Sequence, residues 1–155
     1  MPSNKQVIIK LSCSFILSLG LIKLLSSNIS LLISNTDSLP QHYFLRYYKL
    51  TPVINNYTVV NSNWYGGKVI KKIVGQAGDQ LWYDDRGQLF INQQLIGTPH
   101  QLATDGRKLH PIKAQVIPEG LVFLVGDHAR SFDSRYQEFG LIPINELQGL
   151  VVPII

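Results

Sequence analysis

The stretch that decides the fold class is Gln80-Leu81-Trp82-Tyr83-Asp84-Asp85-Arg86-Gly87-Gln88-Leu89-Phe90-Ile91-Asn92-Gln93. It contains two short runs of apolar and aromatic residues, and the polar sequence Asp84-Asp85-Arg86-Gly87 separates them. Asp favours turns because its side chain bonds to nearby backbone N–H groups, and Gly adopts the positive φ angles that a tight turn needs. The stretch therefore predicts a β-hairpin.

Short strand-like segments of the same kind lie on both sides of the hairpin. Beyond residue 40 they alternate with turn residues, and long segments with a helical period are scarce. The predicted strands cover residues 57–60, 68–74, 80–83, 88–93, 114–117, 121–125 and 147–152. Residues 97–111 are predicted to form a loop or a small cap, and residues 142–147 one short helical turn. This pattern is typical of a mainly β fold with antiparallel sheets.

The composition limits the chain to one folded domain. Its 155 residues are 45% hydrophobic and 15% charged, so the chain can bury a core and does not have the composition of a disordered protein. A single cysteine, Cys13, excludes an internal disulfide and a cysteine-based zinc site. The four histidines lack the spacing of metal ligands. The sequence therefore predicts no metal and no cofactor.

Positive charge is concentrated in the first half of the chain. Residues 1–72 hold eight Lys or Arg residues and one acid, Asp37, whereas residues 73–155 hold six against nine acids. Such a distribution suits a nucleic acid or the anionic surface of a bilayer. The sequence has no basic helical pattern and no aromatic motif of RNA-binding domains, so we expect membrane lipid and no nucleic acid as a partner.

The most apolar segment of the sequence covers residues 7–33 and is interrupted by Lys10 and Lys23. If both lysines extend toward the bilayer surfaces, the helix between them, about 20 Å long, approaches the roughly 30 Å thickness of the hydrocarbon core. We therefore expect residues 1–33 to form an N-terminal membrane anchor with one transmembrane helix, followed by a domain over residues 34–155. Two alternatives stay open: a cleaved secretory signal, which also exports the remainder, and a buried amphipathic helix of a soluble protein.

Three polar segments stand out against the β background, at residues 35–40, 69–75 and 126–136. Each alone has an ordinary explanation as a turn, an edge strand with solvated lysines or a loop. In this order, however, they resemble the motifs of the type I signal peptidase family (peptidase family S26), membrane-anchored serine endopeptidases with a Ser/Lys dyad. Asn35-Thr36-Asp37-Ser38-Leu39-Pro40 and Ser131-Phe132-Asp133-Ser134-Arg135-Tyr136 are most similar to the conjugative-transfer, TraF-type branch of this family.

The resemblance assigns the chemistry to Ser38 and Lys71. Ser38 stands at the position of the family's nucleophile, and Lys71 at that of its general base. A neutral lysine can take the proton of a serine hydroxyl if burial lowers its pKa from about 10.4 toward 7 or 8. Strand alternation cannot choose between Lys71 and Lys72, because each shares a face with two apolar residues. The choice of Lys71 rests on the resemblance alone.

Four further residues are expected to support this pair. Thr36 stands where part of the family places a hydroxyl that assists the nucleophile's backbone N–H in binding an oxyanion, although it could equally cap a turn. Ser131 is expected to hydrogen-bond the lysine amine and orient it. Asp133 and Arg135 are expected to form an ion pair that holds the last loop.

The function that the resemblance implies is cleavage of signal or leader peptides from exported precursor proteins, after a small residue. The implied location is the bacterial inner membrane, with the catalytic domain, a peptidase S26 domain over residues 34–155, on the periplasmic side. The TraF-type branch further implies a pilin-like precursor in conjugative transfer. An extended precursor could bind by adding a strand to an exposed sheet edge.

Three other interpretations stay open. A LexA-like self-cleaving Ser/Lys peptidase shares the dyad, but its DNA-binding front half does not fit the apolar residues 7–33. A base at His128 or His42 lacks a recognisable orienting partner. A membrane-anchored β module that binds a partner without catalysis is the alternative from another class, and the presence of both Ser38 and Lys71 speaks against it.

Overall fold

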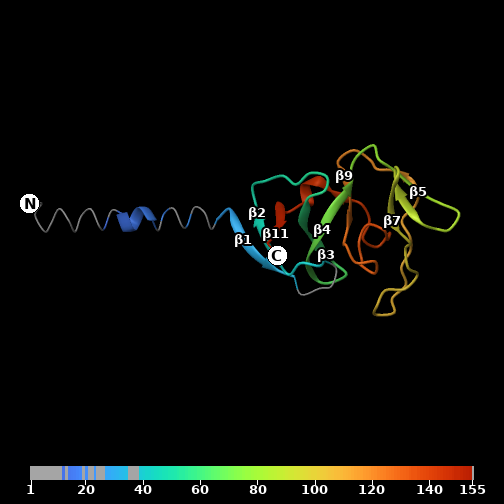
Figure 1. Cartoon of the computed structure of the whole chain (residues 1–155), viewed down its shortest axis with the longest axis horizontal. Helices are drawn as coiled ribbons and strands as arrows, with labels where there is room; N and C mark the ends of the chain where they lie inside the picture. The colour runs from blue at the N-terminus through green and yellow to red at the C-terminus, as the bar shows by residue number, and fades with distance from the viewer. Residues whose placement is uncertain are drawn as a thin grey trace, which may run out of the picture.

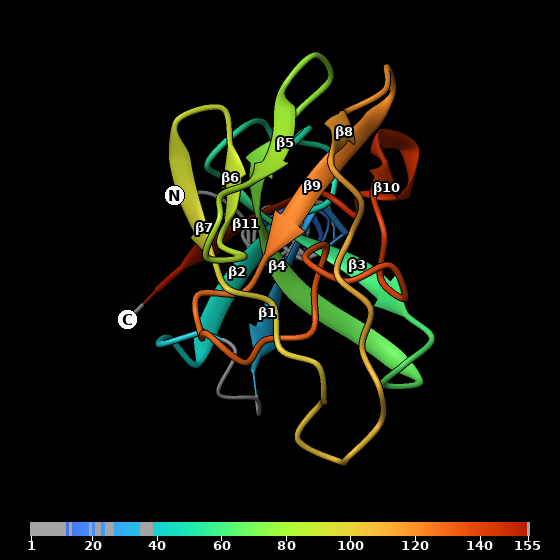
Figure 2. The ribbon, with the colours of Figure 1, turned by 90° about the vertical axis from the view of Figure 1, so that its right-hand side faces the viewer.

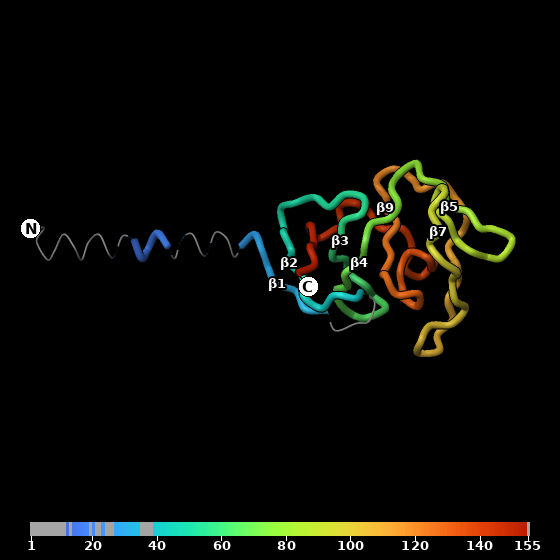
Figure 3. The backbone as a smooth tube through the Cα atoms, in the orientation of Figure 1, coloured from blue at the N-terminus to red at the C-terminus, as the bar shows by residue number. Residues whose placement is uncertain are grey.

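The described part of the chain folds into two antiparallel β-sheets (Figure 1). The structure, a computed structural model, describes residues 12, 14–18, 20, 23, 27–34 and 39–154. Residues 14–18 are helical and lie apart from the sheets (Figure 3). Among the described residues, no helix combines the length and the apolar character that a bilayer span requires.

The larger sheet has the strand order β1-β2-β11-β3-β4-β9-β10, and each neighbouring pair is antiparallel. Its strands are β1 (Ile29–Ile33), β2 (Tyr43–Tyr47), β3 (Tyr57–Ser62), β4 (Gly67–Gly75), β9 (Leu121–Val125), β10 (Ile142–Pro143) and β11 (Leu150–Pro153). The smaller sheet, in the order β7-β6-β5-β8, comprises β5 (Gln80–Tyr83), β6 (Leu89–Ile91), β7 (Gln94–Gly97) and β8 (Gln115–Val116). The predicted helical turn is the 3-10 turn η1 (Ile144–Glu146). The prediction of a mainly β, antiparallel fold is confirmed.

The predicted hairpin is formed by β5 and β6, which pair antiparallel. Asp84 Oδ1 accepts hydrogen bonds from the backbone N–H groups of Arg86 (3.0 Å) and Gln88 (2.8 Å). Gly87 has a φ angle of 73°, in the left-handed region that favours glycine. The turn residues therefore act in the way that the sequence predicts.

The strands β1, β2, β7 and β10 are absent from the sequence-based prediction. Residues Ile29–Ile33, which belong to the predicted anchor over residues 1–33, form the strand β1 instead. Ser26, Ser27 and Asn28 separate this strand from the apolar residues before it. The predicted strand over residues 88–93 is wrong at its end, because Asn92, with a φ angle of 52°, turns the chain from β6 into β7. In β2 the charge of Arg46 obscures the pattern, yet this side chain is buried and donates hydrogen bonds to Gln148.

The largest core cluster lies where β4 and β9 meet the smaller sheet. Its buried members are Val74, Leu81, Leu89, Ile91, Ile112, Ile117 and Phe123. The register between β4 and β9 shifts before Gly75, where a Cβ would lie 2.8 Å from Ile117 Cδ1 and 2.9 Å from Phe123 Cβ. Figure 2 shows β9 beside β4. This packing brings the loop after β9 over the middle of β4, where the candidate site lies.

Candidate active site

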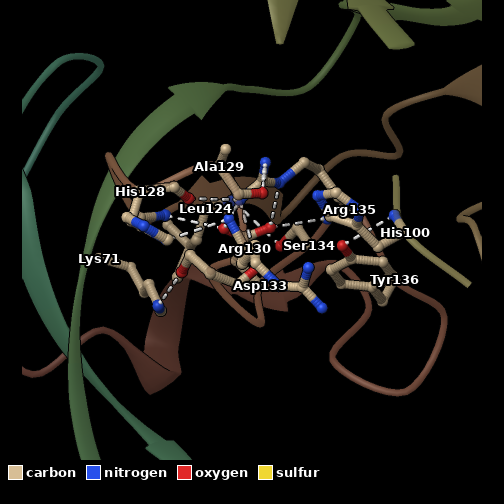
Figure 4. A network of polar contacts seen from close by, with 12 residues as sticks. Lys71, His100, Leu124, His128, Ala129, Arg130, Asp133, Ser134, Arg135 and Tyr136 are labelled. Carbon is tan, nitrogen blue, oxygen red and sulfur yellow. Dashed lines mark hydrogen bonds and ion pairs between the residues drawn. The ribbon is translucent and has the colours of Figure 1, made fainter. Parts of the chain in front are cut away.

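Lys71 lies in the middle of β4, and its side chain is only 1% exposed. Its Nζ donates a hydrogen bond to Ser131 Oγ over 2.6 Å (Figure 4). Burial lowers the pKa of Lys71 from 10.5 to about 8, although the nearby carboxylates of Asp133 and Asp127 act in the opposite direction. An amine with this pKa is neutral in a sizeable fraction of molecules near pH 7 to 8, and it can accept a proton from a hydroxyl brought to it.

The adjacent lysines of β4 point to opposite faces of the sheet. Lys71 is opposite the fully buried Thr58 of β3, on the face that the loop after β9 covers. Lys72 is half-buried and opposite Tyr57, with its Nζ 5.9 Å from the centroid of that ring. Alternation in the sequence cannot show which face this loop covers, so only the tertiary structure distinguishes the two lysines.

The loop after β9, residues 126–136, is held by a buried ion pair. Arg135 Nε and Nη2 each lie 2.8 Å from a carboxylate oxygen of Asp133, and both residues are at most 3% exposed. Asp133 also accepts a hydrogen bond from the backbone N–H of Gly126 at 2.9 Å. Arg135 donates to three backbone carbonyl oxygens, those of His128, Ala129 and Ser131. The pair thus fixes the backbone around Ser131, whose hydroxyl contacts Lys71.

Sequence reasoning misses two further residues of this loop. Ser134 is fully buried; its Oγ accepts a hydrogen bond from Leu124 N–H (3.0 Å), and its own N–H donates to Leu124 O (2.9 Å). Asp127 accepts a hydrogen bond from the Tyr57 hydroxyl over 2.8 Å, and burial together with this carboxylate raises the pKa of Tyr57 to about 12. Both contacts join the loop to neighbouring strands. The only sequence signal for either residue is its place inside the polar segment 126–136.

Gly126 allows the loop to approach Lys71, because a Cβ at this position would collide with Ser131 Oγ and lie 3.1 Å from Lys71 Nζ. We expect Gly126→Ala to displace Ser131 from the lysine and to cost about 1–3 kcal/mol of stability, the usual effect of overpacking. Urea unfolding measures the stability. Gly67→Ala in β4 is the matched control, since nothing lies within 4 Å of a Cβ there. Equal stability of the two variants would contradict this role of Gly126.

The predicted nucleophile Ser38 and the predicted oxyanion hydroxyl of Thr36 lie outside the described residues. The described chain resumes at Leu39, which is 3% exposed and packs in one cluster with Phe44, Val59 and Val151. The roles of Ser38 and Thr36 stay predictions. The structure brings together the other four predicted site residues, Lys71, Ser131, Asp133 and Arg135.

The two histidines considered as alternative bases contact backbone groups. His42 Nδ1 lies 3.3 Å from the carbonyl oxygen of Ser34, and His128 Nδ1 accepts a hydrogen bond from Arg130 N–H over 3.1 Å. Within the described part of the chain, neither ring contacts a carboxylate, the group that orients a histidine base in a Ser-His-Asp triad. The same part contains no group of three or more His, Cys, Asp or Glu residues arranged to hold a metal.

The sequence of this chain matches a known family. Residues 9–155 match the family model described as signal peptidase, peptidase S26. The protein therefore belongs to the signal peptidase family S26, and the family predicted from the three motifs is confirmed.

The known proteins similar to this chain include a conjugal transfer protein and a signal peptidase I. The conjugal transfer protein TraF of Agrobacterium fabrum strain C58 is 34% identical over 93 residues, which cover 59% of this chain and 50% of that protein. The matched part thus spans half the length of this relative, and the match agrees with the predicted TraF-type branch. A crystal structure of a signal peptidase I from Enterococcus faecalis V583 is 25% identical, with a TM-score of 0.42, and the match covers 64% of this chain and 95% of that one.

Proposed function

We propose that this protein is a membrane-bound serine endopeptidase that cleaves leader peptides from exported precursors, with Ser38 as nucleophile and Lys71 as general base. The observation that carries the proposal is the buried Lys71 amine, whose pKa is about 8 and whose Nζ is oriented by Ser131. A solvated lysine on a strand would have neither property. The family membership supports the peptidase chemistry.

The proposed reaction uses the lysine twice. The neutral Nζ of Lys71 takes the proton of Ser38 Oγ as this oxygen attacks the scissile carbonyl, and the backbone N–H of Ser38 with the Thr36 hydroxyl stabilises the oxyanion. The tetrahedral intermediate collapses, the leaving amine takes the proton from the Lys71 ammonium, and the leader remains as an ester on Ser38. Water, activated by Lys71, then hydrolyses this ester.

The packing of Leu39 places the residue that follows Ser38 beside β4. Leu39 is bonded to Ser38 and belongs to the same cluster as Val59 of β3 and Ile70 of β4. Ile70 faces Val59 across the β3–β4 ladder and directly precedes Lys71. The residue after the proposed nucleophile is therefore anchored on β4 next to the proposed base in the chain, on the face opposite to the Lys71 side chain. The proposed pairing requires Ser38 to approach Lys71 from the free edge of β4.

A free strand edge beside Lys71 supports a peptide substrate. The pairing of β4 with β9 starts at Lys72, whereas β4 pairs with β3 from Gly67 onward. Among the described strands, none pairs with residues 67–71 on the β9 side. An extended precursor that adds to this edge would present its backbone next to the lysine.

The site is proposed to lie on the periplasmic face of the bacterial inner membrane. The apolar residues before Ile29 would hold the chain in the membrane, and β1 would connect this anchor directly to the sheet. The TraF relative is described as a conjugal transfer protein, so we propose a pilin-like precursor of a conjugation system as the substrate.

Cleavage is expected to rise with pH, to reach half of its maximum near pH 8 and to level off about one pH unit higher. Only the neutral amine accepts the serine proton, so activity is lost as the pH falls through the Lys71 pKa of about 8. Asp127→Asn removes a negative charge that raises this pKa, and we expect the midpoint to move to lower pH. The measurement is kcat/KM between about pH 6 and 10, with Asp85→Asn in the exposed hairpin turn as control. A midpoint that both variants leave in place would contradict the proton-transfer role of Lys71.

Co-expression with candidate precursors tests the proposed function. Wild-type protein is expected to shorten an exported, pilin-like precursor to its mature size, and Ser38→Ala is expected to leave the precursor uncut. If both proteins gave the same product pattern with every candidate precursor, the anchored binding module would replace the peptidase as the leading hypothesis.

A further inference from the structure

A pocket lined by aromatic side chains adjoins the loop that carries Ser131. Its volume is about 330 Å³, within the range of small ligand pockets. Arg130 and Phe132, two of its lining residues, are the immediate neighbours of Ser131, which contacts Lys71. The pocket therefore begins one residue from the proposed site, yet the proposed chemistry does not use it.

The floor of the pocket is aromatic and its rim is partly apolar. Phe132 is buried; its ring stacks on Trp64 at 4.2 Å between centroids and meets the edge of Tyr65 at 6.1 Å. Tyr65 and Leu102, which also line the pocket, each leave 50% of their surface exposed. Exposed apolar surface around an aromatic floor favours burial of another apolar or aromatic side chain.

The charged groups at the pocket give it one uncompensated cation. Asp105, which lines the pocket, forms an ion pair with Arg107 outside the lining, and the Arg107 guanidinium lies 3.4 Å from the centroid of the Trp64 ring. The Arg130 side chain makes no hydrogen bond or ion pair among the residues that the structure describes. A carboxylate next to the apolar side chain would therefore find a partner at Arg130.

The pocket reaches the turn that leads into the free edge of β4. Tyr65 lies in the turn between β3 and β4, two residues before Gly67, where this edge begins. A strand advances about 3.3 Å per residue, so six residues of extended chain separate Tyr65 from Lys71 at most. A precursor segment paired with the edge could reach the pocket within about six residues of its scissile bond.

We propose that this pocket is a specificity site that binds one large apolar side chain of the precursor, aromatic or aliphatic, while Arg130 binds an adjacent carboxylate. This inference rests on the proposed function and extends it, because it names a sequence feature of the substrate. Precursors that carry such a pair near the cleavage site are the preferred ones.

Trp64 provides a direct readout of the pocket. The chain has two tryptophans, so Trp82→Phe leaves Trp64 as the single one. In a Ser38→Ala, Trp82→Phe background, acetylated and amidated ten-residue peptides of alanine and serine that carry one Phe-Glu, Phe-Gln or Ala-Glu pair are titrated while Trp64 emission is recorded. We expect saturable changes and about tenfold tighter binding of the Phe-Glu peptide than of the Ala-Glu peptide.

Matched variants separate the pocket from the rest of the surface. Leu102→Ala is expected to weaken binding of the Phe peptides, whereas Leu95→Ala, at a side chain of equal exposure on the smaller sheet, is not. Arg130→Gln is expected to abolish the advantage of Phe-Glu over Phe-Gln, and Arg86→Gln in the exposed hairpin turn is expected to preserve it.

Equal affinity for the Phe-Glu and Ala-Glu peptides, or equal effects of the Leu102 and Leu95 variants, would overturn the assignment of the pocket. Precursor cleavage is measured separately and would be unaffected by that result. Selective peptide binding by a chain that cleaves no precursor would instead overturn the proposed function and leave the pocket assignment standing.

Discussion

Lys71→Met is expected to lower precursor cleavage by about 10²–10⁴-fold, the usual contribution of a general base. The methionine fills the same buried space but cannot accept the proton of Ser38. Lys72→Met is the matched control, because Lys72 is the adjacent lysine of β4 and points to the other face. The measurement is kcat/KM on a purified precursor at about pH 8.5. Equal losses in both variants would contradict the assignment of Lys71 as the base.

The stability of Lys71→Met distinguishes lost chemistry from lost folding. A pKa lowered from 10.5 to about 8 means that the buried ammonium costs about 3 kcal/mol at pH 7. The variant should therefore be at least as stable as wild type there. Between about pH 8 and 10.5 the unfolded wild-type chain binds more protons than the folded one, so wild type gains stability relative to the variant as the pH rises. Urea unfolding at pH 7 and pH 10 measures both effects.

Asp133→Ala is expected to lower the free energy of unfolding by about 3–5 kcal/mol. The substitution leaves the buried guanidinium of Arg135 without its counter-ion and removes the acceptor of the Gly126 N–H. Asp105→Ala is a matched control with the same two-residue spacing, because Asp105 pairs with Arg107 at the exposed surface. Solvent screens that pair, so no measurable loss is expected.

Urea unfolding of the two full-length aspartate variants at pH 7 tests this expectation. Similar midpoints for Asp133→Ala and Asp105→Ala would show that the buried pair does not stabilise the loop after β9. The account of how Ser131 is held would then be wrong, whatever the catalytic role of Lys71.

The sequence predicts strands where local pattern and turn residues agree, as at the hairpin of β5 and β6. It misses strands that form because of their partners in the sheet and not because of their own residue pattern. β1 is apolar except for Ser30, so periodicity cannot distinguish it from an apolar helix. β2 includes Arg46, whose burial depends on Gln148, 102 residues away in the chain. The residues near Arg46 in the sequence therefore cannot show that its side chain is buried.

The order of the motifs predicts the members of the site but not how they contact each other. Lys71 and Ser131 are 60 residues apart and meet because the loop after β9 covers one face of β4. The face that this loop covers distinguishes Lys71 from Lys72. The sequence alone does not show which face that is. The close approach at Gly126 is likewise visible only once the loop and the strand are together.

The central claim is that Ser38 attacks the precursor with Lys71 as its base, and identification of the acylated residue tests it most directly. The full-length protein is mixed with a precursor, quenched in acid within the first turnover and digested for mass spectrometry. The account predicts an ester between Ser38 and the leader fragment, absent in Ser38→Ala and formed at least about 100-fold more slowly in Lys71→Met. An ester on another residue, or undiminished cleavage by Ser38→Ala, would contradict it.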